Sequence, residues 1–186
     1  STDGNIRLWQ VSNGRLLQTL SGHSGYVTGL DYSPDGRILA SCAEDFLVKL
    51  WSVANSQTQE TIDEGMARIN SLSFSPDGKM LAWSETDGAV RLWALSGEWL
   101  FVQKGTSLSA NSVSFSPDGL RLATGFGDGT MRIWGAPGGE LQQVLKSHTQ
   151  SITALAFSPD GRWLVSASLD GTLRLWLSAG GSIQAI

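Results

Sequence analysis

The stretch that decides the fold is LVSASLDGTLRLW, residues 164–176. Two mainly apolar segments flank the pair Asp170-Gly171, and this pattern is typical of two antiparallel strands joined by a tight turn. The tryptophan that ends the stretch is one of five spaced 42, 42, 41 and 42 residues apart: Trp9, Trp51, Trp93, Trp134 and Trp176. A regular period of this length predicts an array of equivalent units that bury one another's faces.

Two further positions recur with these tryptophans. An aspartate stands six residues before each one: Asp3, Asp45, Asp87, Asp128 and Asp170. A cation stands two residues before each one: Arg7, Lys49, Arg91, Arg132 and Arg174. Because strand side chains alternate between faces, each cation shares a face with its tryptophan. We expect the aliphatic stems of the cations to pack along the blades, rather than the five charges forming an anion-binding ring.

Four copies of Ser-Pro-Asp-Gly mark a second turn in each complete unit, beginning at Ser33, Ser75, Ser116 and Ser158. Proline sets the first turn position and glycine accepts the positive φ that ends the turn. Each complete unit then reads as four short strands, a pattern typical of a β-propeller blade. We expect the first two strands of each unit near the central axis and the polar fourth strand at the outer edge.

The units predict one continuous array over residues 1–186. An N-terminal half blade is followed by four complete blades, with these boundaries: 1–20, 21–62, 63–103, 104–145 and 146–186. Four and a half blades would leave strand edges exposed, which proteins normally avoid. Two interpretations stay open. Either the chain is part of a longer propeller, or two copies of the chain together complete one ring.

Composition excludes several classes of function. The net charge is −4, and Lys and Arg are spread through the units without a basic block, so we expect no nucleic-acid or anionic-membrane surface. No apolar run is long enough for a membrane span. The lone cysteine, Cys42, implies no disulfide and no oxidising compartment, and we expect a cytoplasmic protein. Two His and one Cys without ligand spacing predict no metal site and no cofactor.

Taken together, these residues resemble the WD40-repeat family, through four Ser-Pro-Asp-Gly turns, five Asp-x5-Trp pairs and a His at the start of two units. The resemblance covers essentially the whole chain and implies an all-β propeller of four-stranded antiparallel blades. It also implies a scaffold for protein–protein interaction, and we expect the docking or sensor part of a larger regulatory protein, whose partners are other proteins or peptides. The alternative is a self-associating propeller fragment, a homo-oligomer whose ring is completed by a second chain.

The family resemblance also implies a structural tetrad, in which a His, a Ser or Thr, the turn Asp and the Trp are hydrogen-bonded. Two units match it in full. The first has His23, Ser41, Asp45 and Trp51, and the fourth has His148, Ser166, Asp170 and Trp176. The third unit keeps Thr124, Asp128 and Trp134, with Thr106 at the His position. The second keeps Asp87 and Trp93, with Gly65 at the His position and Trp83 at the Ser position.

A His, a Ser and an Asp together also occur in hydrolases. Here the trio recurs in two units, although an enzyme needs its nucleophile and base only once. Satisfying buried polar atoms, in contrast, is needed in each blade. We therefore expect a framework role and no catalytic site.

A binding surface must be asymmetric, so positions that differ between aligned units are the candidates for partner binding. In this family, partners commonly dock on the face that carries the Asp turns. The variable positions fall in two neighbouring units, at Tyr26, Glu44, Arg68 and Thr86. Trp83 is a further candidate with two interpretations: it fills the volume that the missing His vacates, or it is an exposed aromatic anchor.

Overall fold

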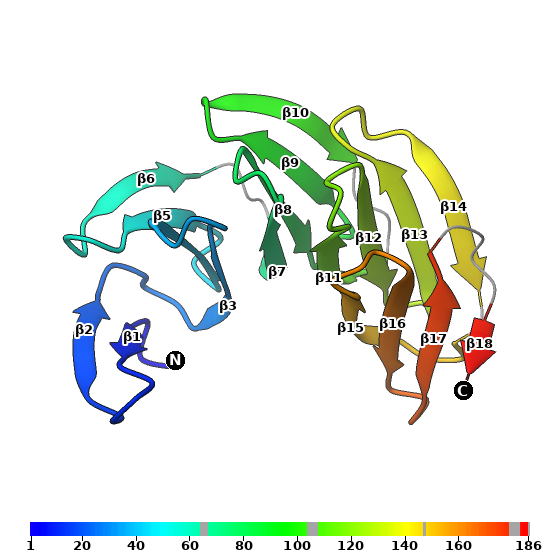
Figure 1. The fold of residues 1–186 in the computed structure, drawn as a ribbon, viewed down its shortest axis with the longest axis horizontal. Coiled ribbons are helices and arrows are strands. Elements are labelled where there is room, and N and C mark those ends of the chain that lie inside the picture. Colours follow the sequence, from blue (N-terminus) through cyan, green and yellow to red (C-terminus); the bar gives the residue numbers. More distant parts are fainter. Residues whose placement is uncertain (64–66, 104–107, 147, 179–182, 186) are drawn as a thin grey trace.

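The computed structural model describes residues 1–63, 67–103, 108–146, 148–178 and 183–185. Its eighteen strands form one two-stranded and four four-stranded antiparallel sheets, so the predicted all-β propeller of four-stranded blades is confirmed. We call the two-stranded sheet the half blade and number the other sheets blades 1 to 4 along the chain. Figure 1 shows the sheets side by side in an arc, with the chain termini at its two ends.

The sheets follow the chain in order. The half blade pairs β1 (Ile6–Trp9) with β2 (Leu16–Leu20). Blade 1 contains β3 (Val27–Tyr32), β4 (Ile38–Ala43), β5 (Val48–Ser52) and β6 (Thr58–Ile62). Blade 2 contains β7 (Ile69–Phe74), β8 (Met80–Glu85), β9 (Val90–Ala94) and β10 (Glu98–Gln103).

The last two blades have the same order. Blade 3 contains β11 (Ala110–Phe115), β12 (Arg121–Phe126), β13 (Thr130–Gly135) and β14 (Leu141–Lys146). Blade 4 contains β15 (Ile152–Phe157), β16 (Trp163–Ser168), β17 (Leu173–Leu177) and β18 (Ile183–Ala185). In every blade each strand pairs with the next one along the chain, so the fourth strand lies at an edge of its sheet, as predicted.

The hydrophobic core lies between neighbouring blades. The first strands of consecutive blades contact one another, β3 with β7, β7 with β11, and β11 with β15. One cluster joins blades 1 and 2 through residues such as Cys42, Phe74 and Trp83. Equivalent clusters join blades 2 and 3, and blades 3 and 4. Burial raises the pKa of the Cys42 thiol to about 11, so this side chain acts as a small apolar residue of the core.

A repeated hydrogen bond also links each blade to the next. The second residue of the first strand donates to a backbone carbonyl of the following blade, with distances of 2.7, 2.8 and 2.9 Å: Thr28 to Ile69, Asn70 to Ala110, and Asn111 to Ile152. We call these three bonds the inter-blade rungs. They satisfy polar groups within the interfaces, where an unpaired group would be costly.

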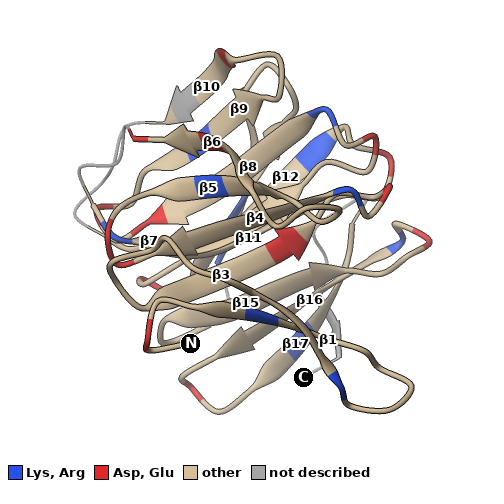
Figure 2. Cartoon of the chain, turned by 90° about the vertical axis from the view of Figure 1, so that its left-hand side faces the viewer, with Lys and Arg blue, Asp and Glu red and all other residues tan. Residues whose placement is uncertain are grey.

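Charged residues lie mainly near strand ends and turns, and Figure 2 shows Lys and Arg (blue) scattered among Asp and Glu (red) on the face it presents. Among the residues that the structure describes, there is no helix of the length and apolar character needed to cross a membrane.

Candidate functional site

The tetrad residues of blade 1 form one continuous chain of hydrogen bonds. Trp51 Nε1 donates to Ser41 Oγ at 2.7 Å. Ser41 Oγ lies 2.7 Å from His23 Nε2, and His23 Nδ1 lies 2.9 Å from Asp45 Oδ2. Because a carboxylate only accepts, we assign the imidazole proton to Nδ1 and the Ser41 hydroxyl as donor to Nε2. The chain ties the strand tryptophan to the turn and to the loop before β3.

Blade 4 repeats this geometry with four equivalent residues. Its three distances are 2.9, 2.8 and 2.9 Å along the chain Trp176, Ser166, His148 and Asp170. Blade 3 keeps the first link, because Trp134 Nε1 donates to Thr124 Oγ1 at 2.8 Å. Its turn residue Asp128 accepts from the backbone and hydroxyl of Thr130. The positions aligned with the histidine in blades 2 and 3, Gly65 and Thr106, lie outside the described residues.

The His-Ser-Asp trio is closed to a substrate. Ser41 and Ser166 are completely buried, and each hydroxyl is already engaged by an imidazole and an indole. A nucleophile must instead reach the reacting atom of a bound substrate. In the described part of the chain, no group of three or more His, Cys, Asp or Glu residues could hold a metal ion. What this arrangement can do chemically is satisfy buried polar atoms and fix a turn.

We expect acid to destabilise the protein through the blade 1 tetrad. Burial lowers the pKa of His23 below its ordinary value of 6.5, and the hydrogen bond to Asp45 offsets this only in part. The unfolded chain therefore binds a proton at His23 before the folded chain does. The resulting loss of stability begins as pH falls below about 6.5 and continues through the folded pKa.

Asp45 adds a second loss at lower pH. Burial favours its neutral form, but hydrogen bonds from His23 and the Ser24 backbone outweigh this and lower its pKa below 3.8. Urea denaturation at pH 7.5, 6 and 5, values chosen to bracket the ordinary histidine pKa of about 6.5, should give progressively lower midpoints. His23→Gln should flatten that part of the profile, and equal midpoints for the wild-type protein would contradict the assignment.

Blade 2 replaces the tetrad by a different buried cluster. Trp83 is 2% exposed, and its Nε1 donates to Glu85 Oε1 at 3.0 Å. Arg91 pairs with Glu85 at 2.6 Å, and Trp99 packs edge-on against Trp83 with ring centroids 5.4 Å apart. Trp83 therefore cannot be an exposed anchor for a partner, and that interpretation is corrected. The indole is instead part of the core between blades 1 and 2, at the position where blades 1 and 4 carry the small tetrad serine.

The strand register explains why these residues meet. Trp83 and Glu85 are two residues apart on β8, so they share a face, and Arg91 lies opposite Trp83 on β9. Burial raises the pKa of Glu85, while Arg91 and Trp83 lower it by less. Trp93 is one of the two tetrad residues that blade 2 keeps. Blade 2 has no tetrad serine to accept from its indole, and Trp93 Nε1 has no hydrogen-bond partner among the described residues.

Four of the five cations that precede the tryptophans contact their own sheets. Lys49 Nζ donates to Thr61 at 3.2 Å, and Arg132 lies 4.3 Å from the ring centroid of Phe126. Arg7 pairs with Asp3, as Arg91 does with Glu85. These local contacts favour the packing interpretation over an anion-binding ring.

The candidate partner-binding residues other than Trp83 lie next to one another. The backbone N–H of Glu44 donates to the carbonyl of Tyr26 at 2.9 Å, and the N–H of Thr86 donates to that of Arg68 at 2.9 Å. Arg68 and Glu44 form an ion pair of 3.0 Å that joins blade 2 to blade 1. The Tyr26 side chain is 54% exposed beside them.

A fifth residue of this surface, Phe46, is missing from the sequence-based candidates. It follows Asp45 in the turn, has φ of 66°, and is 45% exposed. The four aligned positions are all glycines with φ between 73° and 85°: Gly4, Gly88, Gly129 and Gly171. The left-handed conformation costs an ordinary residue about 1–2 kcal/mol. The signal was available in the sequence, since this is the one Asp-Phe among the Asp-Gly turns.

Comparison with known proteins agrees with the geometry. A family model described as the IFT122 first β-propeller matches residues 1–185. The relatives include DDB1- and CUL4-associated factor 13 from Dictyostelium discoideum, 42% identical over 45 residues, which are 24% of this chain and 10% of the relative. Nuclear distribution protein PAC1 from Mycosarcoma maydis is 46% identical over 41 residues, 22% of this chain and 9% of the relative.

A third relative is the small ribosomal subunit protein RACK1y from Oryza sativa subsp. japonica. It is 40% identical over 45 residues, which are 24% of this chain and 13% of the relative. Each of these matches therefore spans about one repeat unit, and only about a tenth of the relative's length.

Proposed function

The chain belongs to the WD40-repeat β-propeller family, and from this premise we propose that it is a non-catalytic scaffold on which a protein or peptide docks at one face of blades 1 and 2. Membership of this family implies an interaction scaffold. The buried hydroxyls of the tetrads support a role without catalysis. The docking or sensor part of a larger regulatory protein is the specific role that we propose.

One observation carries the location of the docking site. Five residues that we call the turn-face patch lie beside the Asp turns of blades 1 and 2, at positions that differ between aligned units: Tyr26, Glu44, Phe46, Arg68 and Thr86. The patch combines two exposed aromatic rings with an arginine, and these residue types dominate the energetics of protein interfaces. Phe46 is kept in a strained backbone conformation, which is typical of functional positions. A framework role would be served better by the glycine of the other turns.

Replacing Phe46 with glycine separates function from packing, because stability and binding should change in opposite directions. Relief of the left-handed strain should raise the free energy of unfolding by about 1 kcal/mol. Loss of the aromatic ring should weaken partner binding by about ten-fold or more. Urea denaturation measures the first effect. Pull-down with wild-type protein, followed by titration of the recovered partner, measures the second.

The matched control is Val11→Ser, which removes an exposed apolar side chain outside the turn-face patch. It should leave partner binding unchanged, whereas Arg68→Glu should weaken binding as Phe46→Gly does. A Phe46→Gly variant that is stabilised yet binds the same partners with full affinity would contradict the proposed site.

The second candidate function is self-association that completes the ring. It is favoured by the surface beside the half blade, where Leu30 and Tyr32 of β3 are exposed and line a pocket of about 370 Å³ with Trp9. The first strands of blades 2 and 3 are covered by their neighbours, so this face accepts further strands. Light scattering at micromolar concentration should then give the mass of two chains, and a strict monomer would contradict closure by a second copy.

The remaining proposals concern surroundings and organisation. We propose a cytoplasmic location, which agrees with a single, buried cysteine. We propose no nucleic-acid or membrane partner, because basic residues are interspersed with acidic ones. We also propose that the unit boundaries at residues 20, 62, 103 and 145 delimit one array in which each blade depends on its neighbours.

A further inference from the structure

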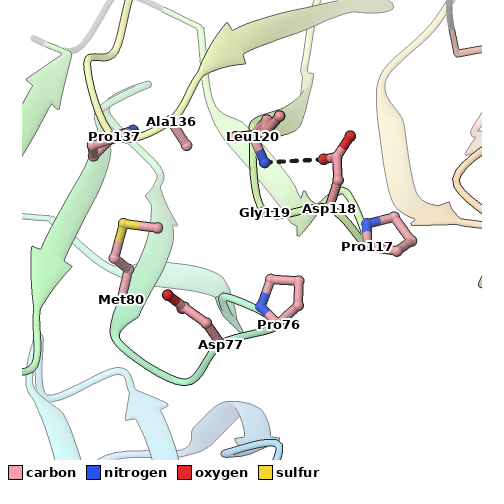
Figure 3. Close-up of a pocket in the computed structure, with 9 residues that line it drawn as sticks. All are labelled: Pro76, Asp77, Met80, Pro117, Asp118, Gly119, Leu120, Ala136 and Pro137. Carbon is pink, nitrogen blue, oxygen red and sulfur yellow. Dashed lines mark hydrogen bonds between the residues drawn. The ribbon is translucent and has the colours of Figure 1, made fainter.

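A pocket of about 420 Å³ lies at the end of the blades opposite to the turn-face patch. The Ser-Pro-Asp-Gly turns and the Asp turns join opposite ends of the second strand in each blade, which places the two sites on opposite faces. Figure 3 shows the lining of the pocket, formed by two of the Ser-Pro-Asp-Gly turns and by the loop after β13. Its apolar side chains come from Pro76, Met80, Pro117, Leu120, Ala136 and Pro137.

Two side chains at this pocket differ from those at the aligned positions. Leu120 stands where the other blades have a cation, namely Arg37, Lys79 and Arg162. Its side chain is 63% exposed. Ala136 stands where the other blades have the larger residues Val53, Leu95 and Ser178. Equivalent backbone hydrogen bonds of 2.9 to 3.0 Å join all four pairs, so the alignment is structural. In blade 3, Leu120 thus provides an apolar surface where the other blades carry a positive charge. The small side chain of Ala136 leaves room that a larger residue fills in the other blades.

The pocket continues into a second hollow of about 530 Å³ along blade 2. The two share Asp77, Met80 and Pro137, and the second one extends to Leu95 and Leu100. Volumes of this size hold several side chains of a ligand. The continuous shape suits an extended segment better than a compact molecule.

Two carboxylates, those of Asp77 and Asp118, line the same pocket as these apolar side chains. Asp77 and Asp118 are each about half exposed, and a serine hydroxyl two residues earlier donates to the Oδ1 of each. These hydrogen bonds lower the pKa of both carboxyls, so both are ionised at neutral pH. The Oδ2 atoms meet their nearest described cations, Lys79 and Arg121, only at 3.9 Å. Both oxygens can therefore accept a further donor.

We propose that this pocket docks an extended peptide segment of a partner protein that carries an aliphatic side chain next to a lysine or arginine. The aliphatic side chain lies on Met80, Leu120 and the prolines, and removes their apolar surface from water. The neighbouring cation reaches Asp77 or Asp118 and forms a charge-assisted hydrogen bond. This site is separate from the turn-face patch, so the propeller presents two docking surfaces of different chemistry.

The probe for this proposal is the peptide acetyl-Gly-Ser-Leu-Arg-Ser-Gly-amide, titrated into ¹⁵N-labelled protein and followed by NMR. We expect saturable shifts at the backbone amides of Gly78, Met80, Gly119, Leu120 and Ala136. The matched peptide with Glu in place of Arg should bind at least about ten-fold more weakly, because it meets two carboxylates. Equal binding of the two peptides, or no shift with the first, would overturn the proposal.

The decisive variant is Leu120→Arg, which introduces the residue type of the aligned turns and should fold with an unchanged Tm. It should weaken binding of the Leu-Arg peptide by about ten-fold or more. Leu169→Arg is the matched control, because it makes the same exchange at an exposed leucine in blade 4 and should leave binding unchanged. Shifts at the pocket that depend on protein concentration without peptide would overturn the proposal in favour of a second copy as occupant.

Discussion

Replacing Trp83 with serine is expected to lower the free energy of unfolding by about 3–5 kcal/mol, the usual cost of removing a large buried aromatic side chain. Although serine stands at this position in blades 1 and 4, blade 2 holds no histidine to pair with it. The substitution would leave a cavity beside Trp99 and take one donor from the buried carboxylate of Glu85. A loss of this size is a large share of the roughly 5–15 kcal/mol that stabilises a typical domain.

Urea denaturation followed by circular dichroism measures this effect, and Trp9→Ser is its matched control. Trp9 is 55% exposed in the half blade, so its replacement should cost less than about 1 kcal/mol. Equal losses for the two variants would show that the buried cluster adds no stability beyond an exposed tryptophan. Trp83→Phe should give an intermediate loss, because it keeps a ring but removes the hydrogen bond to Glu85.

The second large effect is expected for Ser41→Ala. The hydroxyl of Ser41 accepts from Trp51 and lies within hydrogen-bond distance of His23, so alanine would leave two buried polar groups without a partner. Each such group costs about 1–3 kcal/mol, so the two together give an expected loss of about 2–6 kcal/mol. Trp51 should also become less rigidly held, and a near-ultraviolet circular dichroism spectrum would report this.

Blade 2 provides the matched control in Ser84→Ala. Ser84 is as completely buried as Ser41, but its hydroxyl has no hydrogen-bond partner in the described part of the protein. Removing it should be neutral or slightly stabilising, because an unsatisfied polar group is lost together with its desolvation cost. Similar losses for the two alanine variants would contradict the hydrogen-bonded role of Ser41.

The fold could be predicted from the sequence because one pattern is repeated. A turn aspartate and a strand tryptophan at fixed separation appear in each unit, and a consistent pattern of this kind leaves little freedom for another architecture. The residues of the blade 1 and blade 4 tetrads could be aligned in the same way. The contact between Ser41 and Trp51 follows from the pairing of β4 with β5, which sets the two residues diagonally opposite each other on one face.

Departures from the pattern could not be interpreted so fully. Alignment singles out Trp83, but it does not show that Glu85 and Arg91 accept the indole into a buried ion-paired cluster. Such pairing depends on side-chain packing between β8, β9 and β10, which has no one-residue signature. Phe46 and Leu120 were visible as single exceptions in their turns, yet only their exposure and backbone geometry give those exceptions a physical meaning.

The inter-blade rungs have a consequence for how such a chain can change in evolution. Thr28, Asn70 and Asn111 make the same bond to the next blade from the same strand position, about one repeat unit apart. In blade 4 the equivalent Thr153 bonds to a carbonyl of its own sheet. The acceptor is a backbone carbonyl, which every residue has, so the bond does not depend on the side chains of the following blade. Duplication or loss of a gene segment that encodes one unit would lengthen or shorten the array without requiring a new interface.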